Sequence, residues 1–284
     1  MNIVMHPITL QNIVNADPIL IQAYNTNHSF QEELEYYLRL QPDGWFFALH
    51  DATPIGVGGV VNYGPFAYIG LIAVSPTVQR QGVGKLLMEY LLHWLAERDC
   101  LSARLVATNS GAKLYSKIGF IQDDTTAAYR LEYPIEPYAQ TAKEPVFPLR
   151  ADDVEELVAF DKPIFGANRR LVLSSYLKDL PARCFVTRNH DGHITGYIVA
   201  QQDGLGPWSA QTPSEAKTLL THALSLPFEY PIGVRIHTTH SAAVAMLSRY
   251  GFSERRVFKH MYHGSKEPLQ QKEQLYALAS AAIG

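Results

Sequence analysis

Hydrophobic positions in the first half of the chain follow two periods, one typical of strands and one typical of helices. Tyr68 to Val74 is a continuous apolar run rich in β-branched and aromatic residues, and Ser75-Pro76 ends it, which is the pattern of a central strand. After a short loop, leucine recurs every four positions at Leu87, Leu91 and Leu95, as on the buried face of a helix. The pattern therefore predicts a strand, a loop and a helix in succession.

The loop places two glycines, Gly82 and Gly84, directly before the predicted helix. The first N–H groups of a helix lack intrahelical partners, and the peptide dipoles add partial positive charge there. Glycine has no Cβ, so both residues would let an anion approach the backbone closely. Glycine pairs also occur in ordinary turns, so the loop by itself is weak evidence for an anion-binding site.

Further elements follow downstream. Leu101 to Thr108 alternates as a strand, and 109–120 reads as a polar cap at Asn109, a short helix and a glycine stop at Gly119. A weak repeat of 130 to 140 residues pairs Gly119-Phe120 with Gly251-Phe252. We expect first-half strands at Ile3 to Ile8, Trp45 to His50, Ile55 to Tyr63, Tyr68 to Val74, Ala103 to Thr108 and Ala127 to Tyr133.

The motif Gln79-x-x-Gly82-x-Gly84 after Val74-x-Pro76, followed by Asn109 and by Leu114-Tyr115-x-x-x-Gly119-Phe120, resembles the cofactor signature of the GNAT superfamily of N-acetyltransferases. The resemblance implies that acetyl-CoA lies between the strand ending at Val74 and the strand ending near Thr108. It also implies the cofactor-binding residues, which are Leu71, Ile72, Ala73 and Val74 on the strand, Gln79, Arg80, Gln81, Gly82, Val83, Gly84 and Lys85 in the phosphate loop, and Asn109, Ala112 and Tyr115 facing the same cleft.

Tyr115 is the predicted catalytic residue, because its phenol can protonate the departing CoA thiolate. A thiol pKa near 8.5 makes thiolate a tolerable leaving group, so loss of the phenol should slow turnover by about one to three orders of magnitude. The alternative is a core ring with a surface hydroxyl. Backbone N–H groups near Leu71 and Ile72 would polarise the thioester carbonyl.

The general base is not assigned by the sequence. An alkyl amine with a pKa of about 10.4 is only on the order of 0.1% neutral at pH 7, a cost of roughly 4 kcal/mol that some group must offset. Many GNAT enzymes carry a Glu near the strand before the phosphate loop, but Ala67 to Ala73 contains no carboxylate. The open candidates are Asn62, Tyr63 and Tyr68, which could order a water, and Glu33 and Glu35.

Composition limits the class of protein. The 284 residues suffice for about two domains, and 47% hydrophobic with 18% charged residues predicts a globular chain. A net charge of -3 without a Lys/Arg stripe argues against a nucleic-acid partner. The sequence shows neither a long apolar segment nor a signal sequence, so we expect no membrane partner. Two cysteines, Cys100 and Cys184, suggest a reducing, cytoplasmic environment. The histidine pairs His237-x-x-His240 and His260-x-x-His263 lack further ligands nearby, so we expect no metal.

The repeat predicts two tandem GNAT-like domains, each an α/β fold with a twisted mixed sheet flanked by helices. The expected limits are 1–135 for an acetyl-CoA-binding domain, 136–148 for a Pro-rich linker and 149–284 for a second domain. The second half has no glycine loop, and Leu247 stands where Tyr115 stood. It resembles the degenerate C-terminal domain of certain bacterial tandem-GNAT acetyltransferases, through Asp161, Phe165-Gly166-x-x-Arg169, Gly196-Tyr197-Ile198 and Gly206-Pro207-Trp208.

The resulting functional prediction is an enzyme, an N-acetyltransferase that moves an acetyl group from acetyl-CoA to a primary amine by direct attack in a ternary complex. The acceptor is expected to be a small metabolite, and the protein a monomer or homodimer. The segment from Asp17 to Leu40 would line the substrate mouth, with Arg169, Tyr197 and Trp208 contributing from the second domain. The alternatives are a protein or peptide N-acetyltransferase and a non-catalytic acyl-CoA-binding sensor. The tail around Leu275 to Ala279 could be a strand or helix packed on the second domain, or a partner-binding helix.

Overall fold

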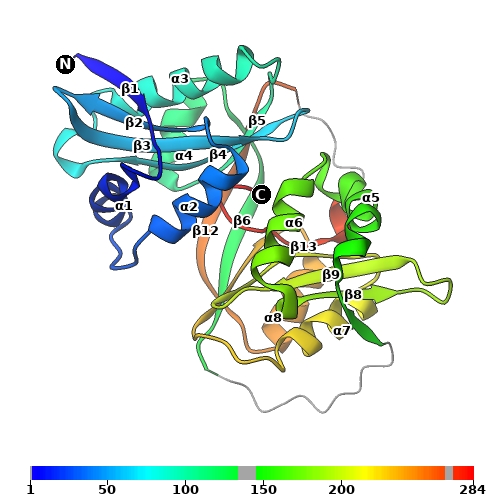
Figure 1. The fold of residues 1–284 in the computed structure, drawn as a ribbon. Helices are drawn as coiled ribbons and strands as arrows, with labels where there is room; N and C mark the ends of the chain where they lie inside the picture. The colour runs from blue at the N-terminus through cyan, green and yellow to red at the C-terminus, as the bar shows by residue number, and fades with distance from the viewer. Residues whose placement is uncertain (1, 134–144, 266–270) are drawn as a thin grey trace. The chain divides into compact units, whose positions relative to one another are not determined.

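The computed structural model describes residues 2–133, 145–265 and 271–284, which form two compact units (Figure 1). Unit 1 contains Met1–Ile121, Met261–Lys266 and Ile283, and unit 2 contains Gln122–His260, Glu267–Ala282 and Gly284. Each unit is a mixed sheet flanked by helices, which confirms the predicted fold class.

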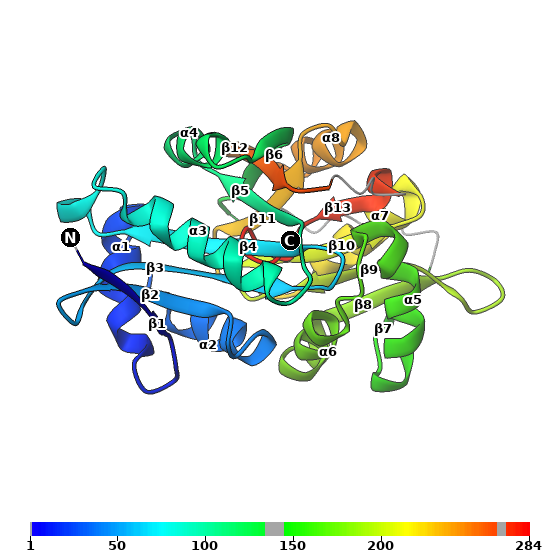
Figure 2. The same cartoon turned by 90° about the horizontal axis from the view of Figure 1, so that it is seen from above.

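The sheet of unit 1 runs in the order β1, β2, β3, β4, β5 and the end of β12, with the first four strands antiparallel and β5 parallel to β4. In Figure 1, α1 and α2 lie on one face of this sheet and α3 on the other. Figure 2 looks down from the α3 side, where α3 lies over β3 and β4. The bounds are β1 Ile3–Pro7, α1 Asp17–Tyr24, α2 Gln31–Leu40, β2 Trp45–His50, β3 Thr53–Asn62, β4 Ala67–Val74, α3 Val83–Ala96, β5 Ala103–Ala107 and α4 Asn109–Lys117, with short 3₁₀ turns at Ile13–Ala16 and Pro76–Val78.

The predicted leucine stripe explains why α3 forms. Leu87, Leu91 and Leu95 are buried in one core cluster with Met88, so the helix is stabilised by its apolar face. Expected and observed strand ends agree within about two residues for the first five strands. The sixth begins earlier than expected, at Ile121, and ends at Leu131.

The segment from Asp17 to Leu40 contains two helices, α1 and α2. Asn25 adopts the left-handed conformation with φ of 52° and ends α1, and asparagine tolerates that conformation better than most residues. The Asp17 carboxylate then accepts hydrogen bonds from the Ser29 hydroxyl at 2.6 Å and from the Phe30 N–H at 2.7 Å. The chain is thereby redirected into α2.

Unit 2 repeats this architecture. Its sheet runs in the order β12, β6, β11, β10, β9, β8 and β7, and β13 pairs with β10. The central helix α7 packs on β9 and buries Leu219 and Leu220. The bounds are β6 Ile121–Leu131, β7 Val146–Pro148, α5 Val154–Phe165, α6 Arg170–Asp179, β8 Cys184–Arg188, β9 Ile194–Ala200, β10 Gly204–Ala210, α7 Pro213–Ala223, β11 Ile232–His237, α8 Ser241–Arg249, β12 Ser253–His263 and β13 Leu275–Ala277, with 3₁₀ turns at Ala151–Asp153, Pro181–Arg183 and Lys272–Gln274.

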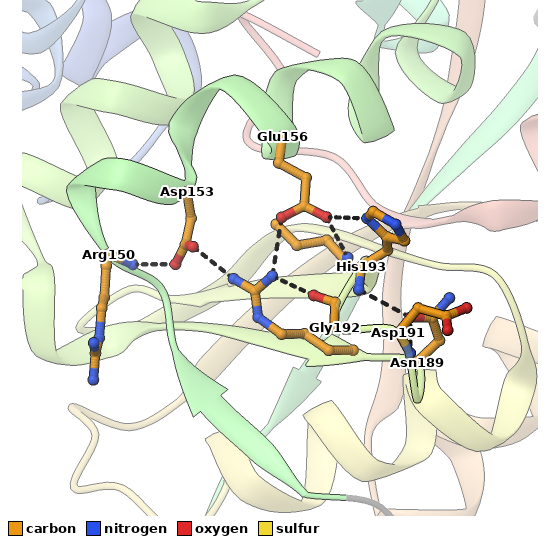
Figure 3. A network of polar contacts seen from close by, with 9 residues as sticks. Arg150, Asp153, Glu156, Asn189, Asp191, Gly192 and His193 are labelled. Atoms are coloured by element: carbon orange, nitrogen blue, oxygen red, sulfur yellow. Dashed lines mark hydrogen bonds and ion pairs between the residues drawn. The ribbon is translucent and has the colours of Figure 1, made fainter.

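A polar network fastens the β8–β9 turn to the start of α5 (Figure 3). The Arg188 guanidinium donates to Asp153 at 2.6 Å, to Glu156 at 2.9 Å and to the carbonyl of Gly192 at 2.8 Å. Glu156 also accepts from the backbone N–H of Ile194 at 2.8 Å. These hydrogen bonds lower the pKa of Glu156, although its partial burial opposes the shift. The network is local and structural.

The structure bears on two further segments, the expected linker and the C-terminal tail. Most of the expected linker, 136–144, lies outside the described residues, and its last three residues form β7. The C-terminal tail is a short strand, β13, whose residues are buried, so the expectation of a packed element is confirmed over that of a partner-binding helix. Within the described residues, no helix is long and apolar enough to cross a membrane.

Candidate active site

The sheet of unit 1 opens between β4 and β5. These parallel strands pair only at their beginnings, where Ala67 lies opposite Ala103 and Tyr68 opposite Arg104. Beyond these pairs, β4 continues to Val74 without a further β5 partner in the described part of the chain. The backbone edge of β4 therefore carries hydrogen-bonding groups that the ladder does not use, which suits an extended ligand.

A bulge lies in the middle of this open stretch. Leu71 has a φ of 53°, and the β3–β4 register shifts between Val57 and Gly59. A bulge leaves backbone groups outside the ladder and re-aims them, and a left-handed leucine costs roughly 1 kcal/mol or more. Leu71 and Ile72 are also half-exposed although β4 is otherwise largely buried. The strained residue thus falls where the sequence places the thioester.

The loop after β4 ends at the uncapped N-terminus of α3. The Gln79 amide donates to the carbonyl of Val74 at 3.0 Å and holds the loop against the strand end. Gly82 has a φ of 90°, and a Cβ built on it meets nothing within 4 Å. The first turn of α3 has neither a side-chain cap nor an acidic residue, so its N–H groups and dipole remain available to an anion.

Gly84 also has a packing role, which the sequence did not indicate. A Cβ on Gly84 would lie 3.3 Å from Cδ2 of Leu114 and 3.6 Å from Cγ2 of Val74. Glycine here lets α3 pack closely against its neighbours. Only Gly82 faces open space in the loop.

Tyr115 lies on α4 and packs in the core of unit 1 with Phe120, at a ring-centroid distance of 5.9 Å. Its ring folds back over the first turn of the helix, where a Cβ on Gly111 would lie 3.0 Å from Cε2 of Tyr115. Burial raises the pKa of the Tyr115 phenol, so it carries its proton at neutral pH. The N-cap of α4 is Thr108, which accepts from the N–H of Gly111 at 3.1 Å.

The other two predicted residues of α4 differ in exposure. Asn109, expected as the cap, is the first helical residue and is exposed. Ala112 is buried in the same core cluster as Tyr115.

Two further titratable side chains are Tyr24 on α1 and Glu33 on α2. The Tyr24 hydroxyl lies 3.4 Å from the carbonyl oxygen of Ile72 and donates to it. Burial raises the pKa of the Tyr24 phenol, and the Glu33 carboxylate raises it further. Glu33 accepts a hydrogen bond of 2.5 Å from the Tyr37 hydroxyl. Glu33 was one of several open base candidates in the sequence; Tyr24 had no signal beyond its place in the apolar stripe.

The remaining base candidates are packed in the structure or exposed. The Tyr63 hydroxyl donates to the carbonyl of Ile283 at 2.7 Å. Tyr68 is buried in β4, and the Asn62 side chain accepts from the N–H of Gly64 at 2.8 Å in the β3–β4 turn. Glu35 is exposed on α2. Among the described residues, it is Glu33 rather than Glu35 that accepts a hydrogen bond from Tyr37.

The expected contribution of the second domain to the acceptor pocket is wrong for its three named residues. Arg169 is buried and donates to both oxygens of Asp161, at 2.7 and 2.8 Å, and to the Tyr197 hydroxyl at 2.8 Å. Trp208 is also fully buried. These residues form the interior of unit 2 and offer no surface to a ligand.

Comparison with known proteins agrees with this geometry. The model of the acetyltransferase (GNAT) family matches residues 10–120, and that of an acetyltransferase (GNAT) domain matches residues 157–277. An uncharacterized N-acetyltransferase of Bacillus subtilis, YitH, is 28% identical over 258 residues, 89% of each chain. A holothin acyltransferase of Pseudoalteromonas is 26% identical over 260 residues, covering 89% of this chain and 85% of that protein.

Solved structures share the fold over nearly the whole chain. A provisionally assigned acetyltransferase from Pyrococcus horikoshii has a TM-score of 0.86 at 24% identity, covering 99% of this chain and 96% of the other. A tandem GNAT protein from the clavulanic acid biosynthesis pathway has a TM-score of 0.61 at 13% identity, covering 94% and 100%. The chain is therefore a tandem GNAT acyltransferase, with two GNAT domains in one polypeptide.

Proposed function

We propose that this protein transfers an acetyl group from acetyl-CoA to the primary amine of a small metabolite, by direct attack in a ternary complex. The observation that carries the proposal is the opening between β4 and β5, which lies beside the uncapped N-terminus of α3. An extended thioester arm and an anionic diphosphate need these two features together.

The donor site in this proposal consists of two backbone surfaces. The edge of β4 from Leu71 to Val74, which β5 does not pair, binds the pantetheine arm, and the N–H groups left outside the ladder by the bulge polarise the thioester carbonyl. The amides from Gln79 to Lys85 bind the diphosphate. Asn109 and Ala112 line the α4 side of the same opening.

Tyr115 acts as the general acid. Its burial keeps the phenol protonated, so the O–H can donate to the thiolate sulfur as the C–S bond breaks. The phenolate then regains a proton from the nitrogen of the new amide. This shuttle leaves the tyrosine unchanged after each turnover.

One donor site per chain follows from a comparison of the two halves, and supports a degenerate second domain. In unit 2 the N-terminus of α7 is occupied by its own capping box, in which Thr212 N–H donates to Glu215 at 2.9 Å and Glu215 N–H donates to the Thr212 hydroxyl at 3.3 Å. A carboxylate stands where an anionic ligand would bind. Leu247, at the position that matches Tyr115, is buried and has no proton to donate.

The opening between β10 and β11 in unit 2 is also filled. These parallel strands pair only at Gly204 and Leu205, as β4 and β5 do at their beginnings. Here, however, β13 pairs with β10 from Trp208 onward, and the N–H of Leu278 donates to the carbonyl of Arg235 on β11 at 2.9 Å. The chain itself uses the backbone groups that a pantetheine arm would need.

We also propose the domain limits 1–135, 136–148 and 149–284. The family matches to 10–120 and 157–277 fall inside the two domains. The compact units divide the chain differently: β6 after Ile121 counts with unit 2, and Met261–Lys266 and Ile283 count with unit 1.

The similarity to a holothin acyltransferase supports a small-molecule acceptor. Thiol release from acetyl-CoA, followed colorimetrically with a panel of small amines and with basic peptides, tests the proposal. We expect amine-dependent release with members of the small-molecule panel. Release only with peptides would indicate a protein acetyltransferase, and tight acetyl-CoA binding without release would indicate a sensor.

A further inference from the structure

The unassigned proton acceptor can be sought among the groups around the opening in unit 1. Tyr24 on α1 donates to the carbonyl of Ile72 within it, Tyr115 lies on α4, which packs on β5, and Glu33 lies in the first turn of α2. Glu33 is the only carboxylate among them. The β4 segment from Ala67 to Val74 contributes none.

Tyr24 connects the β4 bulge to Glu33. Its hydroxyl lies 3.4 Å from the carbonyl oxygen of Ile72, next to the strained Leu71. Its ring packs against Phe30, at a centroid distance of 5.6 Å, just before α2 begins. Burial raises the pKa of the Tyr24 hydroxyl, and the Glu33 carboxylate raises it further. The contact of Tyr24 with Phe30 brings the first turn of α2, which carries Glu33, close to the bulge.

Glu33 is held in place by a rigid partner. The Tyr37 hydroxyl donates to Glu33 Oε1 at 2.5 Å, and the Tyr37 ring is buried and stacked on Trp45 at 5.1 Å with an interplanar angle of 14°. The carboxylate itself is half-exposed. One oxygen is therefore fixed, and the other remains able to accept a proton or bind a cation.

We propose that Glu33 binds the ammonium group of the acceptor and takes its first proton, so that the preferred acceptor is an alkyl amine that is protonated at neutral pH. This inference rests on the proposed function. It assigns the base to the α2 helix instead of the strand before the phosphate loop.

The proton balance is complete without a further reactant. The ammonium gives one proton to Glu33, and the neutral nitrogen forms a C–N bond to the thioester carbonyl carbon. The C–S bond breaks, the thiolate takes the Tyr115 proton, and the second nitrogen proton returns to Tyr115. Glu33 releases its proton to solvent, so amide, CoA thiol and one proton leave.

A carboxylate at this place discriminates between classes of amine. An alkyl amine with a pKa of about 10.4 is neutral in only on the order of 0.1% of molecules at pH 7 and needs a proton acceptor. An aryl amine or an alkoxyamine is already neutral and gains nothing from Glu33. An acceptor site for neutral amines would not need a fixed carboxylate, because desolvating a carboxylate costs free energy when no cation is bound.

Glu33→Gln tests the proposal, because an amide keeps the size of the side chain and can still accept the Tyr37 hydrogen bond. Glu35→Gln is the matched control on the exposed side of the same helix. The kcat/KM of each variant is measured with alkyl amines such as butylamine and phenethylamine, and with neutral amines such as aniline and methoxyamine. Acetyl-CoA binding to each variant is measured by calorimetry.

We expect Glu33→Gln to lower kcat/KM for alkyl amines by roughly 10²–10³-fold, with neutral amines and acetyl-CoA affinity within about threefold of wild type. The loss should shrink as the pH approaches about 10, because the amine then deprotonates in solution. Glu35→Gln should resemble wild type throughout. The shrinking loss separates a chemical role of Glu33 from a structural one.

The opposing outcomes are distinct. An equal loss for both amine classes, no loss at all, or a wild-type enzyme that accepts only neutral amines would overturn the role of Glu33 while the proposed function stands. A wild-type protein that releases no thiol with any amine would overturn the proposed function itself, and the role of Glu33 with it.

Discussion

Replacing Gly82 by valine tests whether backbone amides at the α3 N-terminus bind the diphosphate of acetyl-CoA. Gly82 has a φ of 90° and open space around its Cβ position. The variant therefore incurs strain of about 1 to 3 kcal/mol in stability, and it places a branched side chain over the uncapped amides. Each amide–phosphate hydrogen bond is worth about 1.5 to 3 kcal/mol. Losing one should weaken binding by roughly 10- to 150-fold.

Lys85→Ala is the contrasting change at the same helix terminus. The Lys85 side chain is 56% exposed and lies 3.4 Å from Glu89. An exposed charge of this kind contributes about 1 kcal/mol or less, so we expect at most about a fivefold loss of affinity. Isothermal titration calorimetry with acetyl-CoA measures both variants under the same salt conditions.

Gly192→Val controls for strain alone. Gly192 lies in the β8–β9 turn of unit 2 with a φ of 87° and, like Gly82, has nothing within 4 Å of a built Cβ. The melting temperature of the Gly192→Val variant should fall about as much as that of Gly82→Val, and its acetyl-CoA affinity should be unchanged. Equal affinity losses for the Gly82 and Lys85 variants, or an equal loss for Gly192→Val, would refute the backbone-amide account.

Three further predictions concern catalysis and stability. Tyr115→Phe should lower kcat by about 10- to 10³-fold with little change in acetyl-CoA affinity; an unchanged kcat in stopped-flow thiol release would remove its role as acid. Asp161→Asn should reduce the free energy of unfolding in urea by about 3 to 5 kcal/mol, because it removes the buried carboxylate that forms the ion pair with the buried Arg169 guanidinium; a loss below about 1 kcal/mol would contradict this. Burial lowers the pKa of His237 to about 3 from 6.5, so the unfolded chain binds its proton more readily and stability should fall as pH drops from about 6.5, with a slope of up to about 1.4 kcal/mol per pH unit. His237→Gln should weaken that dependence in urea titrations at pH 7 and pH 5, whereas His190→Gln, whose side chain is 89% exposed, should not.

Local pattern was sufficient to find most elements of the first half. The four-residue spacing of Leu87, Leu91 and Leu95 and the apolar run ending at Ser75-Pro76 each correspond to an observed element. Both signals depend on residues close in sequence, because a buried helix stripe and a central strand need only a core to face. The break at Asn25 was missed, since it depends on hydrogen bonds that Asp17 makes to Ser29 and Phe30.

The candidate site was only partly accessible in the same way. The glycine loop and Tyr115 follow from a motif, but the packing role of Gly84 depends on Leu114, which lies 30 residues away in sequence. Arg169, Tyr197 and Trp208 are aromatic and charged residue types that commonly line binding pockets. Their burial depends on the packing of α5, β9 and β10, which no local spacing indicates.

The sequence by itself determined the family, the tandem repeat and the positions of the glycine loop and Tyr115, because each depends on short-range periodicity or on a contiguous motif. Only the tertiary structure decided where the sheets open and what fills them. Parallel strands pair through residues far apart in sequence, so the end of β4–β5 pairing at Tyr68 and the insertion of β13 beside β10 could not be read from spacing. Likewise, only packing brought Tyr24 to the bulge, since α1 packs on β4 through residues far apart in sequence rather than through local pattern.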